Sequence, residues 1–315
     1  NCLDGRIETL LFKPVMSNLP DVSYLLRLIV LGISASVIYI CIRRFIGRMA
    51  ARLFDWAPTS DRERLLMTAI STLLTIVAVF LAVHFYVYSG LDYQPDIYRM
   101  GNPKTNYVAL TFDDGPSQEF TPLVLDILRE YNAPATFFLV GVHVERYPDI
   151  ARRIAEEGHE IGNHTYRHLT MPTASNKTLY EEVIKATRVI TQITGEFPKY
   201  IRPARGVYDA RFRRLSHVLG QKIVLWTIST RDWRYGTSAQ AIIKRAVSQA
   251  KGGDIILFHD SGALVKNEGG DRSATVRALP QVIEGLRQKG LEIVPLGELL
   301  EEEFGEKFPV VEIPE

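Results

Sequence analysis

The stretch from Leu65 to Tyr88 contains no Asp, Glu, Lys or Arg, and it limits how this chain can fold more than any other feature. As a helix it is long enough to cross a hydrocarbon core of about 30 Å. The helices of soluble domains rarely combine this length with the absence of charge. The sequence therefore predicts a membrane span over 65–88.

A second uncharged run extends from Leu28 to Ile42. At about 1.5 Å per residue it reaches about 22 Å, so it crosses the core only if Tyr24 to Leu26 join it and Arg27 extends to the interface. The alternative is a buried helix of a small soluble domain. We expect two transmembrane helices, over 24–46 and 65–88.

The segment between the two runs is rich in arginine. Its cations are Arg43, Arg44, Arg48, Arg52, Arg62 and Arg64, against Asp55, Asp61 and Glu63. By the positive-inside rule the loop 47–64 is cytoplasmic. We therefore expect a multi-pass protein of the cytoplasmic membrane, with residues 1–23 and the large part after residue 88 on the outer side.

The part after residue 105 alternates strand-like and helical patterns. Strands are expected over 107–113, 135–141, 160–164, 199–203, 222–228, 254–259 and 291–294, and helices over 120–131, 146–157, 176–194, 209–219, 238–250 and 274–289. Seven β/α units favour a barrel, although an open doubly wound sheet would give the same alternation. We expect a linker over 89–105, one domain over 106–300 and an acidic tail over 301–315.

Reactive side chains follow several of these strands. Asp113 and Asp114 come after an apolar segment and stop at Gly115-Pro116. Because neighbouring side chains of a strand point to opposite faces, the two carboxylates are expected to do different jobs. The alternative is an ordinary strand-to-loop junction, since Asp-Gly is a common turn signal.

Four other polar motifs occupy comparable positions and make the junction alone a poorer explanation. They are His164-Thr165-Tyr166-Arg167-His168, Arg202-Pro203, Ser229 to Trp233, and Leu257-Phe258-His259. In parallel α/β folds, catalytic residues gather at the carboxyl ends of the strands. The sequence thus predicts one site at that edge.

Composition narrows the class of protein. The formal net charge is +1, so there is no large positive field that would indicate binding to nucleic acid. The two cysteines are Cys2 and Cys41, and Cys41 lies in a presumed membrane span. The outer domain must therefore be stable without disulfides.

Together the motifs resemble the polysaccharide deacetylases with a NodB-homology domain, carbohydrate esterase family 4, over about residues 105–300. Thr111 to Pro116 and His164 to His168 match in full, and the Arg202 and His259 motifs match in part or well. The Asp-x-x-Asp-Trp motif matches only at its end, Asp232-Trp233. The resemblance implies a distorted, incomplete (β/α)7-type NodB barrel, here preceded by two transmembrane helices.

The resemblance also implies a cofactor. Asp114, His164 and His168 take the places of the three metal ligands. Two imidazoles and one carboxylate leave a position open for water, as in catalytic zinc sites. We expect one divalent ion, zinc. A His pair four residues apart would mean little without a carboxylate at a neighbouring strand end.

Proton transfer is assigned in the same way. Asp113 corresponds to the general base, with Arg202 holding it ionised, and His259 to the general acid that protonates the departing amine. In relatives a carboxylate four residues before the motif Trp orients the acid, and here that position is Ser229. Asp232 is the nearby candidate to replace it.

Contacts with the substrate complete the expected site. The backbone N–H of Arg205 corresponds to the oxyanion donor, although relatives carry Tyr there and Ala204 replaces a second Pro. Trp233 is expected beside the acetyl methyl group, and Leu257 is expected to be a further substrate-contacting residue.

The expected function is metal-dependent removal of N-acetyl groups from an amino sugar polymer of the cell envelope, such as the GlcNAc of peptidoglycan. The alternatives are deacylation of a lipid-linked sugar, de-esterification of an O-acetyl polysaccharide, and an inactive carbohydrate-binding relative. Ser229 and Arg205 favour the inactive relative, but the intact ligands, base and acid favour an enzyme. The expected partner is the polysaccharide, in a membrane-embedded protein. No protein partner can be inferred.

Overall fold

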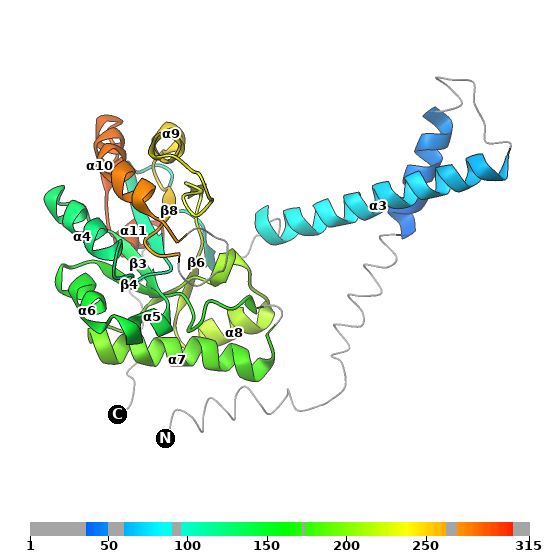
Figure 1. Ribbon diagram of the computed structural model, residues 1–315. Coiled ribbons are helices and arrows are strands. Elements are labelled where there is room, and N and C mark those ends of the chain that lie inside the picture. The colour runs from blue at the N-terminus through cyan, green and yellow to red at the C-terminus, as the bar shows by residue number, and fades with distance from the viewer. Residues whose placement is uncertain (1–35, 50–59, 90–95, 172–173, 263–269, 305–315) are drawn as a thin grey trace. The chain divides into compact units, whose positions relative to one another are not determined.

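The computed structural model describes residues 36–49, 60–89, 96–171, 174–262 and 270–304, and the chain divides into two compact units (Figure 1). One unit comprises Asn1–Tyr93 with Val310–Glu315, and the other comprises Gln94–Pro309. The residues that carry chemistry in the sequence all belong to the second unit.

In the first unit the structure describes two helices, one over 36–49 and α3 over Asp61–Ser89. At the start of α3 the Ser60 hydroxyl accepts the Glu63 N–H and the Glu63 carboxylate accepts the Ser60 N–H, which is a capping box. In the part of the chain that the structure describes, α3 is the one helix long and apolar enough to cross a membrane, over Asp61–Phe80. Residues 24–35 of the other expected span lie outside the described residues, so two spans are not confirmed.

The described residues of the second unit form a parallel sheet of nine strands in the order β1-β6-β5-β4-β3-β2-β8-β7, with β9 paired to the start of β2. The strands are β1 (Ile97–Tyr98), β2 (Tyr107–Asp113), β3 (Thr136–Leu139), β4 (Glu160–Asn163), β5 (Tyr200–Ile201), β6 (Lys222–Val224), β7 (Ile228–Ser229), β8 (Ile255–His259) and β9 (Glu292–Ile293). Every strand pair is parallel. The sheet is a half-barrel, consistent with the incomplete barrel that the resemblance implied, but it has nine strands where seven were expected.

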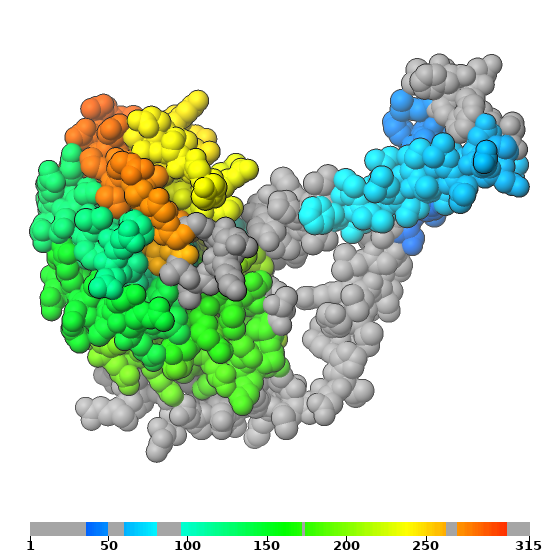
Figure 2. All heavy atoms as spheres, in the orientation of Figure 1, coloured from blue at the N-terminus to red at the C-terminus, as the bar shows by residue number. Residues whose placement is uncertain are grey.

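Helices surround this sheet (Figure 1). They are α4 (Thr121–Glu130), α5 (Gly141–Arg146), α6 (Pro148–Glu156), α7 (Asn176–Thr194), the 3-10 helix η2 (Ala204–Gly206), α8 (Ala210–Val218), α9 (Ala239–Gln249), α10 (Ser273–Gln288) and α11 (Leu296–Phe304). Figure 2 shows a face of the unit whose surface is formed largely by helical segments, from α4 in teal to α10 in orange. Side-chain caps fix where α7, α8 and α9 begin, through Ser175, Asp209 and Ser238.

Strand β2 lies within the sheet between β3 and β8. Its side chains point alternately into two hydrophobic clusters, one on each face of the sheet. Val108, Leu110 and Phe112 join the large cluster between the sheet and its helices. Ala109 belongs instead to a second cluster with residues of β5, β6, β8 and α11. Since side chains alternate across a strand, Thr111 and Asp113 share the face of Ala109, where the site is built.

Helix α11 packs against that second face. Leu296, Leu299 and Leu300 are buried in the cluster with Ala109. The Glu160 carboxylate, at the amino end of β4, accepts the N–H of Gly297 at 3.0 and 3.1 Å. This N–H lies in the first turn of α11, where it has no acceptor within the helix. This helix continues past residue 300 to Phe304.

Several expected elements differ from the observed ones. Strand β1 lies within the expected linker over 89–105, and the strand expected over 199–203 is reduced to β5. The helix expected over 146–157 begins only at Pro148, because Tyr147 has a non-helical backbone and the preceding α5 is a separate helix. The strand expected over 135–141 ends at Leu139. The strand expected over 222–228 is two short strands, since Leu225 N–H donates to Tyr98 of β1 whereas Thr227 N–H donates to Ile255 of β8.

The packing around Phe112 predicts how much its substitution should lower the free energy of unfolding. Its ring stacks on those of Phe137 at 5.1 Å and Phe258 at 5.4 Å between centroids, and all three are fully buried. Phe112→Ala should lower the free energy of unfolding by about 3–5 kcal/mol, because it leaves a cavity. Leu123→Ala on α4, where the side chain is exposed, should change it by less than about 0.5 kcal/mol. Urea-induced unfolding of the full chain measures both, and equal effects would contradict this account of the core.

Candidate active site

The expected site residues meet at the carboxyl edge of the sheet. Asp113 ends β2 and lies opposite His259 of β8 in the register. His164 follows β4, and Arg202 follows β5. Asp232 lies in the loop after β7, which pairs with β8. The strand order thus brings together residues that are up to about half the chain apart in sequence.

Arg202 is completely buried and holds the carboxylate of Asp113. Its Nη1 donates to Asp113 Oδ1 at 2.6 Å and to Thr111 Oγ1 at 3.0 Å. Its Nε and Nη2 donate to the carbonyl oxygens of Val224 and Leu225, at 3.1 and 3.0 Å. This arrangement fixes one oxygen of Asp113, while Oδ2 lies 3.6 Å from His164 Nε2, facing the predicted ligands.

The three predicted metal ligands form a tight cluster. Asp114 Oδ1 lies 3.5 Å from His164 Nε2 and 3.3 Å from His168 Nε2, and one donor atom from each residue fits within 4.8 Å. Ligands at about 2.0–2.1 Å from a tetrahedral ion are about 3.3–3.4 Å apart. The separations of the donor atoms therefore fit one small divalent ion.

The hydrogen bonds of the cluster favour metal binding too. His164 Nδ1–H donates to the carbonyl oxygen of Arg202 at 2.8 Å, which leaves the Nε2 lone pair directed at the cluster. Within the described residues, Asp114 Oδ1 is buried without a hydrogen-bond partner. A bound cation would satisfy that oxygen.

The charges of the cluster lead to the same conclusion. Burial lowers the pKa of His168 to about 4, so its imidazole is neutral and can donate a lone pair. Burial opposes ionisation of Asp114, but His164 and His168 hold the pKa of its carboxyl below the usual range. Burial also disfavours a charge on His164, yet Asp113 and Asp114 raise its pKa. The position favours a positive charge, which a metal ion supplies as well as a proton does.

His259 is oriented by Asp232. Its Nδ1–H donates to Asp232 Oδ1 at 2.8 Å, and its backbone N–H donates to Asp232 Oδ2 at 2.7 Å. Thr275 on α10 donates a further hydrogen bond to that Oδ2 at 2.9 Å. The carboxylate that Ser229 cannot provide therefore comes from Asp232, the replacement that the sequence left open.

The Asp232 carboxylate also sets the charge of His259. Burial by itself would lower the pKa of this imidazole, but Asp232 and, more weakly, Asp114 and Asp113 raise it to about 9. His259 is therefore protonated at neutral pH and can donate a proton.

The three expected substrate contacts lie in different surroundings. Arg205 is exposed and has a left-handed backbone, with φ 60°, in η2. Trp233 is 39% exposed in the loop after β7. Leu257 is buried on β8, two residues before His259 and on the same face of the strand.

Comparison with known proteins agrees with this geometry. The model of the family described as polysaccharide deacetylase matches residues 100–224. A peptidoglycan-N-acetylglucosamine deacetylase of Bacillus cereus is 39% identical over 196 residues, which are 61% of this chain and 87% of that protein. The chain belongs to the polysaccharide deacetylase family.

Two further relatives support the assignment. A chitooligosaccharide deacetylase of a Bradyrhizobium species is 34% identical over 200 residues, 62% of this chain and 91% of that protein. The crystal structure of the Bc1960 peptidoglycan N-acetylglucosamine deacetylase, in complex with 4-naphthalen-1-yl-N-oxidanyl-benzamide, superposes with a TM-score of 0.62 at 36% identity, over 65% of this chain and 93% of that one. This chain is a carbohydrate deacetylase, a hydrolase of carbon–nitrogen bonds other than peptide bonds.

Several residues that support the site of this deacetylase were not identified from the sequence. His143 on α5 donates from Nδ1–H to the carbonyl oxygen of Asp114 at 2.7 Å. Glu182 and Asn163 bind the loop between the two His ligands. Thr275 gave no sequence signal, because its role depends on how α10 packs beside the loop of Asp232.

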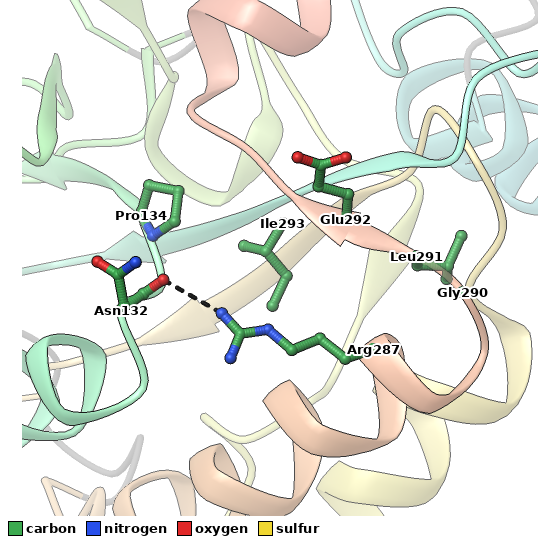
Figure 3. A pocket seen from close by; sticks show the side chains of 7 residues that line it. All are labelled: Asn132, Pro134, Arg287, Gly290, Leu291, Glu292 and Ile293. Atoms are coloured by element: carbon green, nitrogen blue, oxygen red, sulfur yellow. Dashed lines mark hydrogen bonds between the residues drawn. The ribbon is translucent and has the colours of Figure 1, made fainter.

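A pocket at the opposite edge of the sheet is separate from these residues. It is lined by residues before β3, on α10 and at β9, and Arg287 donates there to the carbonyl oxygen of Asn132 at 3.1 Å (Figure 3). None of the expected site residues lines it. The pocket and the candidate site thus lie at opposite edges of the sheet.

The pair of Asp232 and His259 predicts a shift that can be measured by NMR. In Asp232→Asn the carboxylate that favours the charged imidazole is lost while burial still disfavours it, so the pKa of His259 should fall well below about 9. Because the folded-state pKa is the higher one, the stabilising effect of this pair is complete below pH 6.5 and is lost as the pH rises through 9. The stability of the wild type should therefore decline over that range, and that of Asp232→Asn should decline less.

Ser229→Ala is the matched control and should leave the titration of His259 unchanged. Imidazole signals of the full chain without metal, followed over pH, give both pKa values. An unaltered His259 titration in Asp232→Asn would show that another group sets its charge.

Proposed function

We propose that this deacetylase uses one zinc ion to remove the N-acetyl group from N-acetylglucosamine in peptidoglycan, outside the cytoplasmic membrane. The observation that carries the proposal is that a metal-binding cluster, a carboxylate held by a buried arginine and a protonated histidine meet at one edge of the sheet. Together a metal ion, a general base and a general acid can hydrolyse an amide.

Asp114, His164 and His168 would hold the ion. Two nitrogen donors and one oxygen donor at tetrahedral separations match a catalytic zinc site with an open position. When bound, the ion would make water more acidic and polarise the acetyl carbonyl. The polysaccharide deacetylase family is metal-dependent, which supports this assignment.

Asp113 is the proposed general base. Its Oδ1 is fixed by Arg202 at 2.6 Å, so Oδ2, on the side of the ligand cluster, is the oxygen available to accept a proton. The attacking water gives this proton to Asp113 while its oxygen bonds to the acetyl carbon. Arg202 orients the carboxylate beforehand through this charged hydrogen bond.

His259 is the proposed general acid. Protonated at neutral pH, it gives a proton to the sugar nitrogen as the carbon–nitrogen bond breaks, and the products are acetate and a free amine. An amide nitrogen cannot leave as an anion, whereas the oxygen of an ester is a better leaving group. A histidine kept protonated by Asp232 therefore favours N-deacetylation over removal of an O-acetyl group.

The substrate is proposed from the relatives. Peptidoglycan-N-acetylglucosamine deacetylase and chitooligosaccharide deacetylase are the names of the relatives described above. Both substrates are polymers or oligomers of N-acetylated amino sugars. A position on the outer side of the membrane would place peptidoglycan within reach.

Membrane anchoring is supported by the surface of α3. Leu65, Leu73 and Phe80 are 71%, 62% and 67% exposed, and such apolar side chains along one helix are expected to contact lipid. The arginine-rich loop before α3 would be cytoplasmic by the positive-inside rule. The carboxyl-terminal deacetylase unit then lies outside the membrane.

Product analysis tests the proposed reaction. The full chain, loaded with zinc and incubated with peptidoglycan fragments, should yield muropeptides lighter by one acetyl group per site, measured by mass spectrometry. Asp113→Asn should reduce the turnover by about two to four orders of magnitude and retain the metal, because Asp113 moves a proton and is not among the ligands.

His168→Ala supplies the contrast. It should lose the bound zinc, which is expected at about one ion per wild-type chain. Metal content by atomic emission separates the two roles. Stoichiometric zinc in His168→Ala would refute the ligand set, and near-normal turnover in Asp113→Asn would assign the base elsewhere.

Labelling of cysteines tests the proposed topology. With Cys2 and Cys41 replaced by serine, a single cysteine placed within 48–60 should resist a membrane-impermeant thiol reagent in intact cells, because the loop is cytoplasmic. A single cysteine placed after residue 303 should react. The reverse pattern would place the active site in the cytoplasm and exclude a cell-wall substrate.

A further inference from the structure

The loop between the two histidine ligands has a strained backbone. Thr165 and His168 both adopt positive φ angles, of 70° and 58°. A non-glycine residue in this region costs of order 1 kcal/mol or more, so the surrounding structure must hold it there. Since His164 and His168 lie at the two ends of this loop, the geometry of the metal cluster depends on whatever does so.

The ring of His168 packs against that of His164, but among the described residues no second hydrogen bond orients it. His164 is fixed by its hydrogen bond to the carbonyl oxygen of Arg202. The Nδ1 of His168 is buried and has no hydrogen-bond partner within the part of the chain that the structure describes. Most histidine ligands of metals donate this proton to a second group. Here the position of Nε2 must follow from the backbone of the loop.

Glu182 on α7 contacts that backbone directly. Its Oε2 accepts the backbone N–H of Arg167 at 2.7 Å, one residue before His168, and its Oε1 accepts Arg167 Nε at 2.7 Å. The side chain of Glu182 is completely buried, whereas that of Arg167 is 49% exposed. A buried carboxylate is costly unless it is paired and hydrogen-bonded, and both groups that pair with Glu182 here belong to the ligand loop.

The other end of the loop is tied to the same helix. Asn163 Oδ1 accepts the Thr165 N–H at 2.7 Å, and its Nδ2 donates to Val183 and Thr187 of α7, at 3.1 and 2.9 Å. Backbone hydrogen bonds from α5 hold the middle of the loop as well. Asn163 binds the backbone beside the first strained position, and Glu182 binds the backbone beside the second.

We propose that Glu182 is the positioning residue that holds the His168 ligand in place for the metal ion. It acts through the backbone of Arg167 and keeps His168 Nε2 at 3.3 Å from Asp114 Oδ1. The proposal rests on the zinc site of the proposed function and extends it to a residue outside the ligand set.

Glu182→Gln tests the proposal, because glutamine keeps the shape and removes the charge that holds Arg167. Zinc affinity should weaken about tenfold to hundredfold, the usual effect of losing a group that orients a ligand. Glu181→Gln is the matched control: its neighbour Glu181 is half-exposed and pairs with Lys177 of the same helix at 3.9 Å. The control should bind zinc as the wild type does.

The measurements separate positioning from simple stabilisation. Zinc affinity is determined on the full chain by competition with a chromogenic chelator. The visible absorption spectrum of the cobalt(II)-loaded protein reports the ligand geometry, and thermal unfolding without metal reports stability. Positioning predicts weaker zinc binding and an altered cobalt spectrum in Glu182→Gln. A structural role alone predicts a lower unfolding temperature with the wild-type affinity and spectrum, and this result would overturn the proposal.

Arg167→Ala provides a second variant in case Glu182→Gln does not fold. It leaves the backbone N–H in place but removes the cation beside the buried carboxylate, so zinc affinity should weaken about threefold to tenfold. Wild-type affinity in this variant would also count against the proposal. If the wild type itself bound no zinc, the proposed function would fail, and that outcome is distinct from failure of the positioning role.

Discussion

The site depends on one buried cation. Arg202 has no solvent exposure, and its guanidinium lies 3.9 Å from the ring centroid of Phe138 while it bonds to groups on β2 and at the end of β6. A charge in this environment is tolerated because each of its bonds goes to a carbonyl, hydroxyl or carboxylate oxygen. Asp113 supplies the opposite charge. Removing either partner would leave the other buried and unpaired.

Arg202 also orients a ligand through its backbone. Its carbonyl oxygen accepts Nδ1–H of His164, so the side chain fixes the proposed base while the main chain fixes the tautomer of the proposed ligand. The position of Asp113 and the tautomer of His164 thus both depend on Arg202, at the end of a two-residue strand. In the sheet, β4 and β3 lie between β5 and β2, so Arg202 joins strands that are not neighbours.

Much of this arrangement could be predicted from the sequence. The bounds of β2 and α7 agree with their periodic patterns, and the strand ends correctly indicated which side chains would meet. The split between β6 and β7 could not be predicted, because it depends on Leu225 and Thr227 pairing with different strands. Glu182 and His143 were missed for a similar reason: their patterns are those of ordinary helical residues, and packing alone aims them at the site.

The departure at Ser229 shows what the chemistry requires. Thr230 donates to the carbonyl oxygen of Leu257 through both its N–H and its hydroxyl, which ties the loop to β8 just before His259. Arg231 then takes a positive φ of 56°, and the chain turns so that Asp232 reaches both the backbone N–H and the ring of His259. A carboxylate is needed at a place in space rather than at a place in the sequence. A loop anchored on one side and turned sharply on the other can therefore supply it from a neighbouring position, and the imidazole stays charged.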